Sequence, residues 1–480
     1  MEQQNKLNRF PFLIFQGILI VIALLLFEFN WSSIDFQLSC VLGTVLAFLS
    51  LVNVLIFKKK IIDPIIIFFA TFILFQYGLP ILRAFNPNYY SYYLTIFSEA
   101  DLIYCSNITI LCILFAGLAI ILIGERITSR RSFFLNDDRS KMIWIIFFIV
   151  ALFTGIYSMY IQVKVIGYAR AYGYNAAKVD TAGITTSLSR LTDALFVPSV
   201  LIMLVYSKNK LQSLISVGYA LLFAVLCILG GGRTVALGLL LAIGYHIYTR
   251  FFLKRFGKAS ILIAIVGVFL IAYIAVLVAA LRLDSSANIT LGSVIESVFD
   301  EMGFNFTSIC FTRMFVNSPG QFLNGQSYAD LALLLLPKSI DSSGYLETLY
   351  NNIPETWLAT QLALNYGEFF NWGVGYSLIA EAYMNFGDFA YLPIFAITFL
   401  LTWLIDRNHV GNAKLFNEYV KTVMIFSLLT ISRRSSYSLV KELEYKLLIP
   451  VLIIIVVVLI SPLFTARVEN VESKEKTSVA

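Results

Sequence analysis

Long apolar runs alternate with short polar segments along most of the 480-residue chain. Most of these runs approach the ~20 residues that an α-helix needs to cross about 30 Å of hydrocarbon. The pattern predicts an all-α, polytopic membrane protein with about twelve transmembrane helices. The predicted spans are 10–29, 36–57, 61–82, 102–123, 142–162, 189–206, 211–229, 234–249, 259–281, 387–405, 415–431 and 446–464.

One long segment, residues 282–386, separates the ninth predicted span from the tenth. It contains apolar stretches, few prolines and no low-complexity run. It is therefore predicted to be an ordered and mostly helical loop, which we call the cap, and not a linker. The predicted organisation is helices 1–9 in residues 1–281, the cap, helices 10–12 in residues 387–464, and a tail at 465–480.

The distribution of the 35 Lys and Arg residues predicts which side of the membrane each loop faces. The larger share lies in one alternating set of loops, including Lys58–Lys60, Arg126–Lys141 and Arg250–Lys258. Cytoplasmic loops carry an excess of Lys and Arg, so this set is predicted to be cytoplasmic, with both termini. The first apolar run has no small-residue cleavage site and is interpreted as a retained helix. The cap and the turns at Gly230–Arg233 and Ser432–Ser436 are then extracytoplasmic.

Composition narrows the class of protein further. Apolar residues make up 59% of the chain and charged residues only 13%, whereas soluble domains carry about 25% charged residues. The net charge of +6 comes mainly from short loops, so membrane lipids and not nucleic acids are the expected contacts. The five cysteines show no metal-binding spacing, and both histidines, His246 and His409, fall on the predicted cytoplasmic side. We therefore expect no metal and no cofactor at the outer face.

Several arginines lie on the predicted outer face. Arginine stays charged and pairs with phosphate oxygens in a bidentate geometry, so converging arginines suit a lipid diphosphate. The glycines before Arg233 would add backbone N–H donors at the start of a helix, where the dipole favours an anion. The candidate catalytic arginines are Arg233, Arg433 and Arg434, and the candidate substrate-binding residues are Gly231, Gly232, Arg282 and Arg313. Simple binding of lipid headgroups is the alternative role for outer arginines.

A carboxylate accompanies these arginines. Residues Tyr376–Gly387 are predicted to form a short helix at the membrane, on which Glu381 and Asn385 share one face. Glu381 is the candidate catalytic carboxylate, either orienting an arginine or accepting a proton from a sugar hydroxyl. Asn385 and Tyr383 are candidate substrate-binding residues. An ordinary interfacial charge pair is the alternative for Glu381. Other outer carboxylates are Asp300, Glu301, Glu355 and Glu368.

The order and sidedness of several short motifs resemble those of the Wzy-type O-antigen or oligosaccharide repeat-unit polymerases, which are integral membrane proteins related to glycosyltransferase-C enzymes. The motifs are Gly-Gly-Gly-Arg-Thr at 230–234, Glu-Met-Gly at 301–303, Phe-Leu-Asn-Gly-Gln-Ser-Tyr at 322–328, Ala-Glu-Ala-Tyr-Met-Asn-Phe-Gly at 380–387, and Ser-Arg-Arg-Ser at 432–435. Together with the span pattern, the resemblance covers most of the chain.

The resemblance implies a concrete function. Such polymerases act at the outer face of the bacterial inner membrane, in O-antigen or capsule synthesis. They transfer a growing glycan from one undecaprenyl diphosphate to a repeat unit on another, without a nucleotide sugar or metal. A single displacement would invert the anomeric centre. The expected partners are these lipid-linked glycans, membrane lipids and a chain-length regulator.

Three other functions remain open at this stage. A flippase for the same lipid-linked unit would predict charges at the membrane midplane and repeat symmetry, whereas the charges here lie at the outer edge. An O-antigen ligase tends to carry a functional loop histidine, which the predicted outer face lacks. A membrane acyl- or phosphotransferase would usually show a histidine or paired carboxylates at the reacting face.

Overall fold

The computed structural model groups the chain into two compact units. Unit 1 comprises Met1–Arg126, Tyr248–Asp406 and Ser427–Lys441, and unit 2 comprises Ile127–Ile247, Arg407–Phe426 and Glu442–Ala480. The structure describes residues 9–28, 35–59, 62–89, 92–124, 126–128, 140–172, 187–230, 232–253, 296, 299–300, 302–316, 319–336, 341, 343–367, 376–409, 414–457 and 459.

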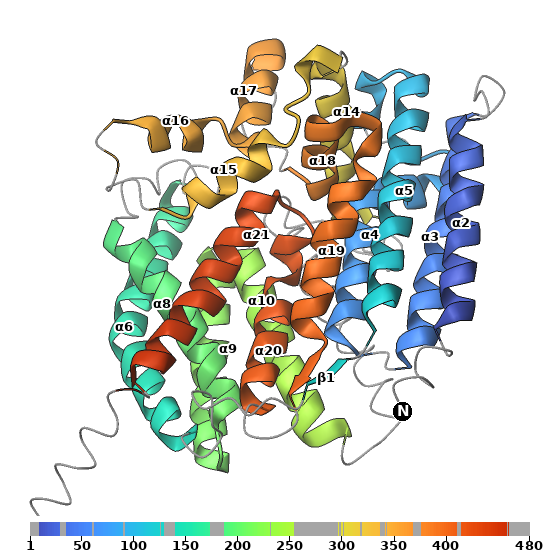
Figure 1. The fold of residues 1–480 in the computed structure, drawn as a ribbon. Helices are drawn as coiled ribbons and strands as arrows, with labels where there is room; N and C mark the ends of the chain where they lie inside the picture. The colour runs from blue at the N-terminus through green and yellow to red at the C-terminus, as the bar shows by residue number, and fades with distance from the viewer. Residues whose placement is uncertain are drawn as a thin grey trace, which may run out of the picture. The chain divides into compact units, whose positions relative to one another are not determined.

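Unit 1 contains long apolar helices together with the described parts of the cap (Figure 1). Its long helices are α2 (Phe10–Glu28), α3 (Phe36–Lys58), α4 (Pro64–Phe85), α5 (Glu99–Ile123) and α19 (Tyr391–Ile405). Its cap helices are α14 (Asn305–Phe315), α15 (Gln326–Leu334), α16 (Tyr345–Asn351), α17 (Pro354–Tyr366) and α18 (Leu378–Phe386). Short helical turns are η2 (Tyr92–Ile96), η4 (Tyr248–Phe252), η5 (Pro319–Gln321) and η8 (Gly387–Phe389).

Unit 2 is a second helical bundle. Its helices are α6 (Ser140–Tyr172), α8 (Ser187–Tyr206), α9 (Lys210–Gly230), α10 (Arg233–Ile247) and η9 (Glu444–Leu448). Helix α20 (Lys414–Ile431) starts in unit 2 and ends in unit 1, and α21 (Ser436–Leu443) starts in unit 1 and ends in unit 2. Two three-residue strands, β1 (Arg126–Thr128) and β2 (Arg407–His409), pair with each other.

The helical class of the fold is confirmed. Within the described part of the chain, six helices are long and apolar enough to cross a membrane, and three more are apolar but shorter. The shorter ones are Phe10–Leu26, Leu191–Tyr206 and Tyr391–Ile405. The predicted span at 259–281 lies outside the described residues, so the count of twelve stays a prediction.

Two predicted element boundaries were wrong. Helix α6 continues to Tyr172, so Lys164 and Arg170 lie on a helix and not in a loop. The helix containing the last predicted span begins at Ser436, ten residues before the predicted start. In both cases hydropathy falls where charged residues begin, but Lys, Arg and Glu are good helix formers, so the helix continues.

Polar side chains connect the helices of unit 1. The side-chain amide of Gln16 on α2 donates to the Ser50 hydroxyl and to the Leu114 carbonyl, both at 2.8 Å. The Tyr77 hydroxyl lies 2.6 Å from the hydroxyl of Ser106. Apolar burial adds little to association in lipid, so such hydrogen bonds help to join the helices. They link α2, α3, α4 and α5, which run side by side (Figure 1).

The chain just before α14 packs directly on the backbone of α4. A Cβ atom added at Gly303 would lie 2.3 Å from the amide nitrogen of Leu79 and 2.7 Å from the Cα of Gly78. Helix α14 itself is buried over most of its length and also packs on α5 and α18. The first described helix of the cap is therefore embedded in unit 1.

Opposite ends of unit 1 carry different polar contacts. At one end Arg313 of α14 pairs with Asp101 at the start of α5. At the other end Lys58, the last residue of α3, pairs with Asp406 just after α19, and both side chains are buried. The cap and the Lys58 segment thus lie at opposite ends of the helices, as the predicted alternation of loops requires.

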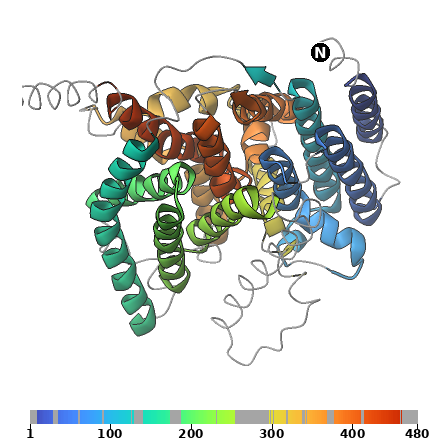
Figure 2. The same cartoon turned by 90° about the horizontal axis from the view of Figure 1, so that it is seen from below.

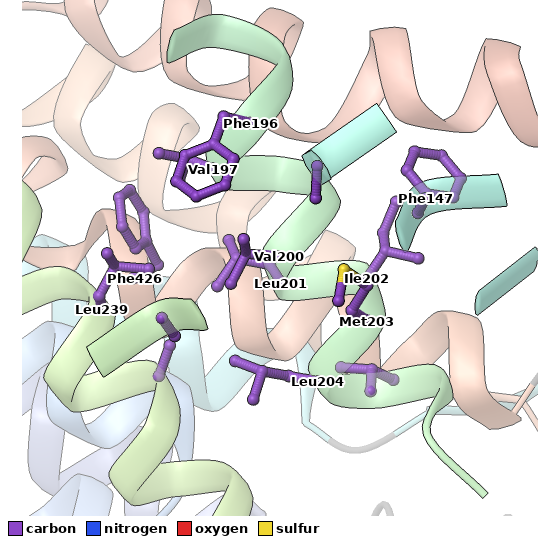
Figure 3. Packing of buried hydrophobic residues seen from close by; sticks show 14 of the residues in the cluster. Phe147, Phe196, Val197, Val200, Leu201, Ile202, Met203, Leu204, Leu239 and Phe426 are labelled. Carbon is purple, nitrogen blue, oxygen red and sulfur yellow. The ribbon is translucent and has the colours of Figure 1, made fainter. Parts of the chain in front are cut away.

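The core of unit 2 is apolar and forms around α8 (Figure 3). Phe196, Leu201 and Met203 of α8 are completely buried. Phe196 meets Phe223 of α9 edge to face, with ring centroids 4.8 Å apart. Seen from below, the teal and green helices α6, α8 and α9 lie next to one another (Figure 2). This bundle fixes the ends of α9 and α10, between which the predicted Gly-Gly-Gly-Arg turn lies.

We predict that Gly303→Ala destabilises unit 1. The added methyl group would meet backbone atoms of α4, which cannot rotate away, and such overpacking typically costs about 1–3 kcal/mol. Thermal unfolding of the purified protein in detergent would show a lower midpoint. Gly320→Ala is the matched control, because nothing lies within 4 Å of a Cβ there. Equal midpoints for the two variants would contradict the close contact.

Candidate functional site

The predicted short helix near residue 381 is confirmed as α18. The Ser377 side chain accepts a hydrogen bond from the Ala380 amide, which caps the start of the helix. Gly387, with φ +56°, ends it in a backbone conformation that favours glycine. Glu381 and Asn385 lie one turn apart, as predicted, and both are completely buried.

Three hydrogen bonds end on the Glu381 carboxylate. Its Oε2 atom accepts from the backbone amide of Ser436 at 2.6 Å. Its Oε1 atom accepts from the Ser436 hydroxyl at 2.6 Å and from the Ser327 hydroxyl at 2.9 Å. A buried carboxylate needs such donors, because desolvation without them is costly. Glu381 thus connects α18 to the start of α21 and to α15.

Asn385 holds the segment that leads into α15. Its side-chain amide donates to the Ser327 hydroxyl at 2.8 Å, and its Oδ1 atom accepts from the Gly325 amide at 3.1 Å. Asn324 and Gly325 both have positive φ, which bends this segment around the end of α18. Two motifs far apart in the sequence, 322–328 and 380–387, therefore form one polar cluster.

The segment Ser432–Ser435, here named the arginine turn, joins α20 to α21 and carries Arg433 and Arg434. The Ser432 carbonyl accepts from the side-chain amide of Gln76 on α4 at 2.7 Å. The Arg433 carbonyl accepts from the side-chain amide of Asn305 on α14, also at 2.7 Å. Both arginine side chains are exposed. The backbone of the turn is therefore held by buried side chains, while both arginines are exposed.

A second carboxylate, Glu355 of α17, binds the far end of the arginine turn. Its Oε1 atom accepts from the Ser435 amide at 3.2 Å and from the hydroxyls of Ser435 and Ser438, each at 2.8 Å. Glu355 and Glu381 thus accept from adjacent residues, Ser435 and Ser436, at the start of α21. The first N–H groups of a helix have no partner within it, and negative charge there is favourable.

The electrostatics of the cluster follow from burial. Burial raises the pKa of Glu381 above its ordinary value, whereas the hydrogen bonds from Ser436 and Ser327 act in the opposite direction. The neighbouring charge of Glu355 raises that pKa further. Each of these donors therefore favours the ionised form of Glu381 against the effect of burial.

Arg313, a predicted substrate-binding residue, has intramolecular partners. Its Nε atom lies 2.9 Å from the Asp101 carboxylate, and its guanidinium lies 3.5 Å from the Tyr104 ring centroid. It also donates to the Tyr383 hydroxyl at 3.3 Å. In this conformation Tyr383 and Asn385 are buried and present almost no surface to a ligand. The substrate-binding roles of these three residues stay predictions.

The predicted Gly230–Arg233 turn is a tight helix–helix connection in unit 2. Helix α9 ends at Gly230 and α10 begins at Arg233, with the Gly232 amide donating to the Cys227 carbonyl at 2.7 Å. Gly231 and Arg282 lie outside the described residues, as does the side chain of Arg233. Arg233 and the arginine turn belong to different units, so their convergence stays a prediction.

The described residues contain no group of three or more His, Cys, Asp or Glu side chains that could hold a metal ion. The arrangement found in unit 1 is of another kind. It consists of two exposed arginines on a turn whose backbone is held by two buried side-chain amides and one half-buried carboxylate, which is suited to binding an anion.

A comparison with known protein families identifies the family of the chain. The model of the O-antigen polysaccharide polymerase Wzy family matches residues 10–463, which is nearly the whole chain. The chain belongs to the O-antigen polysaccharide polymerase Wzy family. No curated protein and no solved structure matches the chain.

Membership in the Wzy family confirms the predicted resemblance. Together with the apolar helices, it identifies a multi-pass membrane protein that polymerises repeat units in polysaccharide synthesis. Sequence reasoning missed two residues that hold the arginine turn, Gln76 and Asn305. Both are polar residues without a distinctive spacing.

We predict different effects for two replacements of Glu381. Glu381→Ala leaves the Ser436 amide buried without an acceptor, a loss of about 1–3 kcal/mol, and should impair polymerisation. Glu381→Gln can still accept from that amide, while its NH₂ group donates to the serine hydroxyls, which can also accept. If Glu381 orients the turn, the Gln variant should therefore polymerise nearly normally.

Initial rates and glycan chain-length ladders from membranes with matched amounts of protein would measure both effects. A base role for Glu381 instead predicts that Gln and Ala are equally defective, by about 10²–10⁴-fold. Equal losses in two well-inserted variants would therefore contradict the orienting role.

Proposed function

We propose that this Wzy-family protein transfers a growing glycan from one undecaprenyl diphosphate to the repeat unit carried by another. The reaction takes place at the outer face of the bacterial inner membrane, with both termini in the cytoplasm. The product is an O-antigen or a capsular polysaccharide. Family membership and the helical membrane architecture support this proposal, and the arginine turn supports its chemistry.

One observation carries the chemical part of the proposal. Arg433 and Arg434 are exposed and adjacent on a turn whose backbone is hydrogen-bonded to side chains of α4, α14 and α17. A fixed backbone places the two guanidinium groups before the substrate arrives. Pre-organised positive charge stabilises a developing anion more effectively than charge that must first reorganise.

The bond changes explain why positive charge is needed. A hydroxyl oxygen of the acceptor sugar forms a bond to the anomeric carbon of the donor, and the bond from that carbon to the diphosphate breaks. The electron pair leaves with undecaprenyl diphosphate, and the hydroxyl proton is released to water. Negative charge therefore grows on the leaving diphosphate, and the arginines stabilise it without a metal ion. A single displacement of this kind inverts the anomeric centre.

Arg233 is a third arginine with a proposed role in binding diphosphate. It starts α10 in unit 2, and the free N–H groups of a first helical turn favour an anion. We propose that Arg233 also stabilises negative charge on the diphosphate. Glu381 takes the orienting role, because both of its oxygens already accept hydrogen bonds from Ser436 and Ser327.

We predict that Arg433→Ala, Arg434→Ala and Arg233→Ala each reduce polymerisation by about 10²–10³-fold, the cost of losing one pre-organised donor. Arg→Lys variants should remain defective, because lysine keeps the charge but loses the bidentate geometry. In a strain lacking the native protein, the surface glycan should collapse to a single repeat unit. Lys210→Ala, which removes an exposed charge at the predicted cytoplasmic end, serves as the control.

The phenotype also separates the competing functions. A flippase defect would leave no surface product, and a ligase defect would accumulate lipid-linked polymer. Normal chain-length ladders from all three well-inserted arginine variants would overturn the proposed site.

A further inference from the structure

We infer that Glu355 is a positioning residue of the polymerase, which fixes the arginine turn from the cap. This inference rests on the proposed role of Arg433 and Arg434. Glu355 lies on α17 of the cap, and its side chain is hydrogen-bonded to Ser435 of the turn and to Ser438 of α21. It contacts no arginine side chain in these hydrogen bonds, so it would act through the backbone and hydroxyl of Ser435.

The geometry shows why one carboxylate oxygen can control the turn. Glu355 Oε1 accepts from the Ser435 amide and hydroxyl and from the Ser438 hydroxyl. Ser435 directly follows Arg434, and its carbonyl accepts from the Leu439 amide in the first turn of α21. The same oxygen thus fixes the position of Ser435, the last residue of the arginine turn, and the position of the first turn of α21.

The contacts at the two ends of the arginine turn differ in kind. At Ser432 and Arg433 the turn offers carbonyl oxygens, which accept from the neutral amides of Gln76 and Asn305. At Ser435 the turn offers an N–H group, which donates to a carboxylate. Hydrogen bonds to charged groups are stronger than those between neutral groups, so the Glu355 end contributes more to fixing the turn.

Glu381 cannot replace this contact. Its hydrogen bonds go to Ser436, one residue further into α21, and to Ser327 of α15. Loss of Glu355 would leave the Ser435 amide without its acceptor and the side of the turn next to Arg434 unrestrained. The arginines would then be placed less accurately, although neither would be removed.

Three variants test the positioning role. Glu355→Ala should lower the polymerisation rate at saturating donor by about 10- to 100-fold, the range for losing hydrogen bonds to a charged acceptor. Glu355→Gln keeps Oε1 as an acceptor and should retain activity within about fivefold of the wild type. Ser438→Ala removes one of the three donors and should cause a smaller loss, and the Glu355→Ala, Ser438→Ala double variant should be no worse than Glu355→Ala.

A second measurement reports on the turn itself. Trypsin cleaves after arginine only where the backbone can loosen, so the exposed Arg433 and Arg434 should be cut slowly in the wild type. Glu355→Ala should speed cleavage at this position, and Glu355→Gln should not. A purely structural contribution to folding would instead lower protein abundance or unfolding temperature without a selective change at this site.

Asp341 provides a matched control in the same cap. Its carboxylate likewise accepts from a serine amide, a serine hydroxyl and a further amide, at Ser343 and Leu346, but it does not contact the arginine turn. Asp341→Ala should leave both the rate and the cleavage at Arg433 and Arg434 unchanged.

Two results would overturn the inference while leaving the proposed function intact. One is wild-type activity of Glu355→Ala in a background where Arg433→Ala is inactive. The other is a Glu355→Gln variant as defective as Glu355→Ala. Full activity of the arginine variants would overturn the proposed function itself, so the two failures are distinguishable.

Discussion

The site in unit 1 depends on two carboxylates beside the start of α21, the buried Glu381 and the half-buried Glu355. An unpaired buried carboxylate is very unfavourable, and here each oxygen that accepts does so from serine N–H or O–H groups. The requirement works in both directions. The carboxylates need these donors, and the first N–H groups of α21 need acceptors. Their mutual satisfaction determines where α20 ends, where α21 begins and how the chain turns between them.

This constraint joins elements that lie far apart in the sequence. Gln76 and Asn305 hold one end of the arginine turn, and Glu355 and Glu381 hold the other. The close packing of Gly303 on α4 brings α14, and with it Asn305, to the same helix that carries Gln76. The cap helices α14, α17 and α18 are therefore structural parts of the site and not only a cover above it.

The sequence predicts the helices better than it predicts which side chains contact one another. The helical class, the helix at 378–386 and the shared face of Glu381 and Asn385 follow from hydropathy and helical spacing, and the structure confirms them. The end of α6 and the start of the last helix cannot be predicted in this way. Hydropathy indicates which residues lie within the membrane, and a helix can extend beyond them. Gln76 and Asn305 have no local signal, since their role depends on which carbonyl the fold brings opposite them. The catalytic roles of the arginines remain predictions from charge and family.

A turn held by side chains of three helices has a consequence for substrate choice. It cannot reshape itself for each sugar, so it is suited to the diphosphate, the chemically constant part of the proposed substrate. Sugar identity must then be recognised elsewhere, by surfaces that can vary without disturbing the turn. The exposed side of α16 satisfies that condition, because Tyr345, Glu347 and Thr348 can be replaced there while Glu355 and Glu381 stay in place. Divergence in glycan structure could therefore proceed by changing the cap's surface while the reaction centre stays the same.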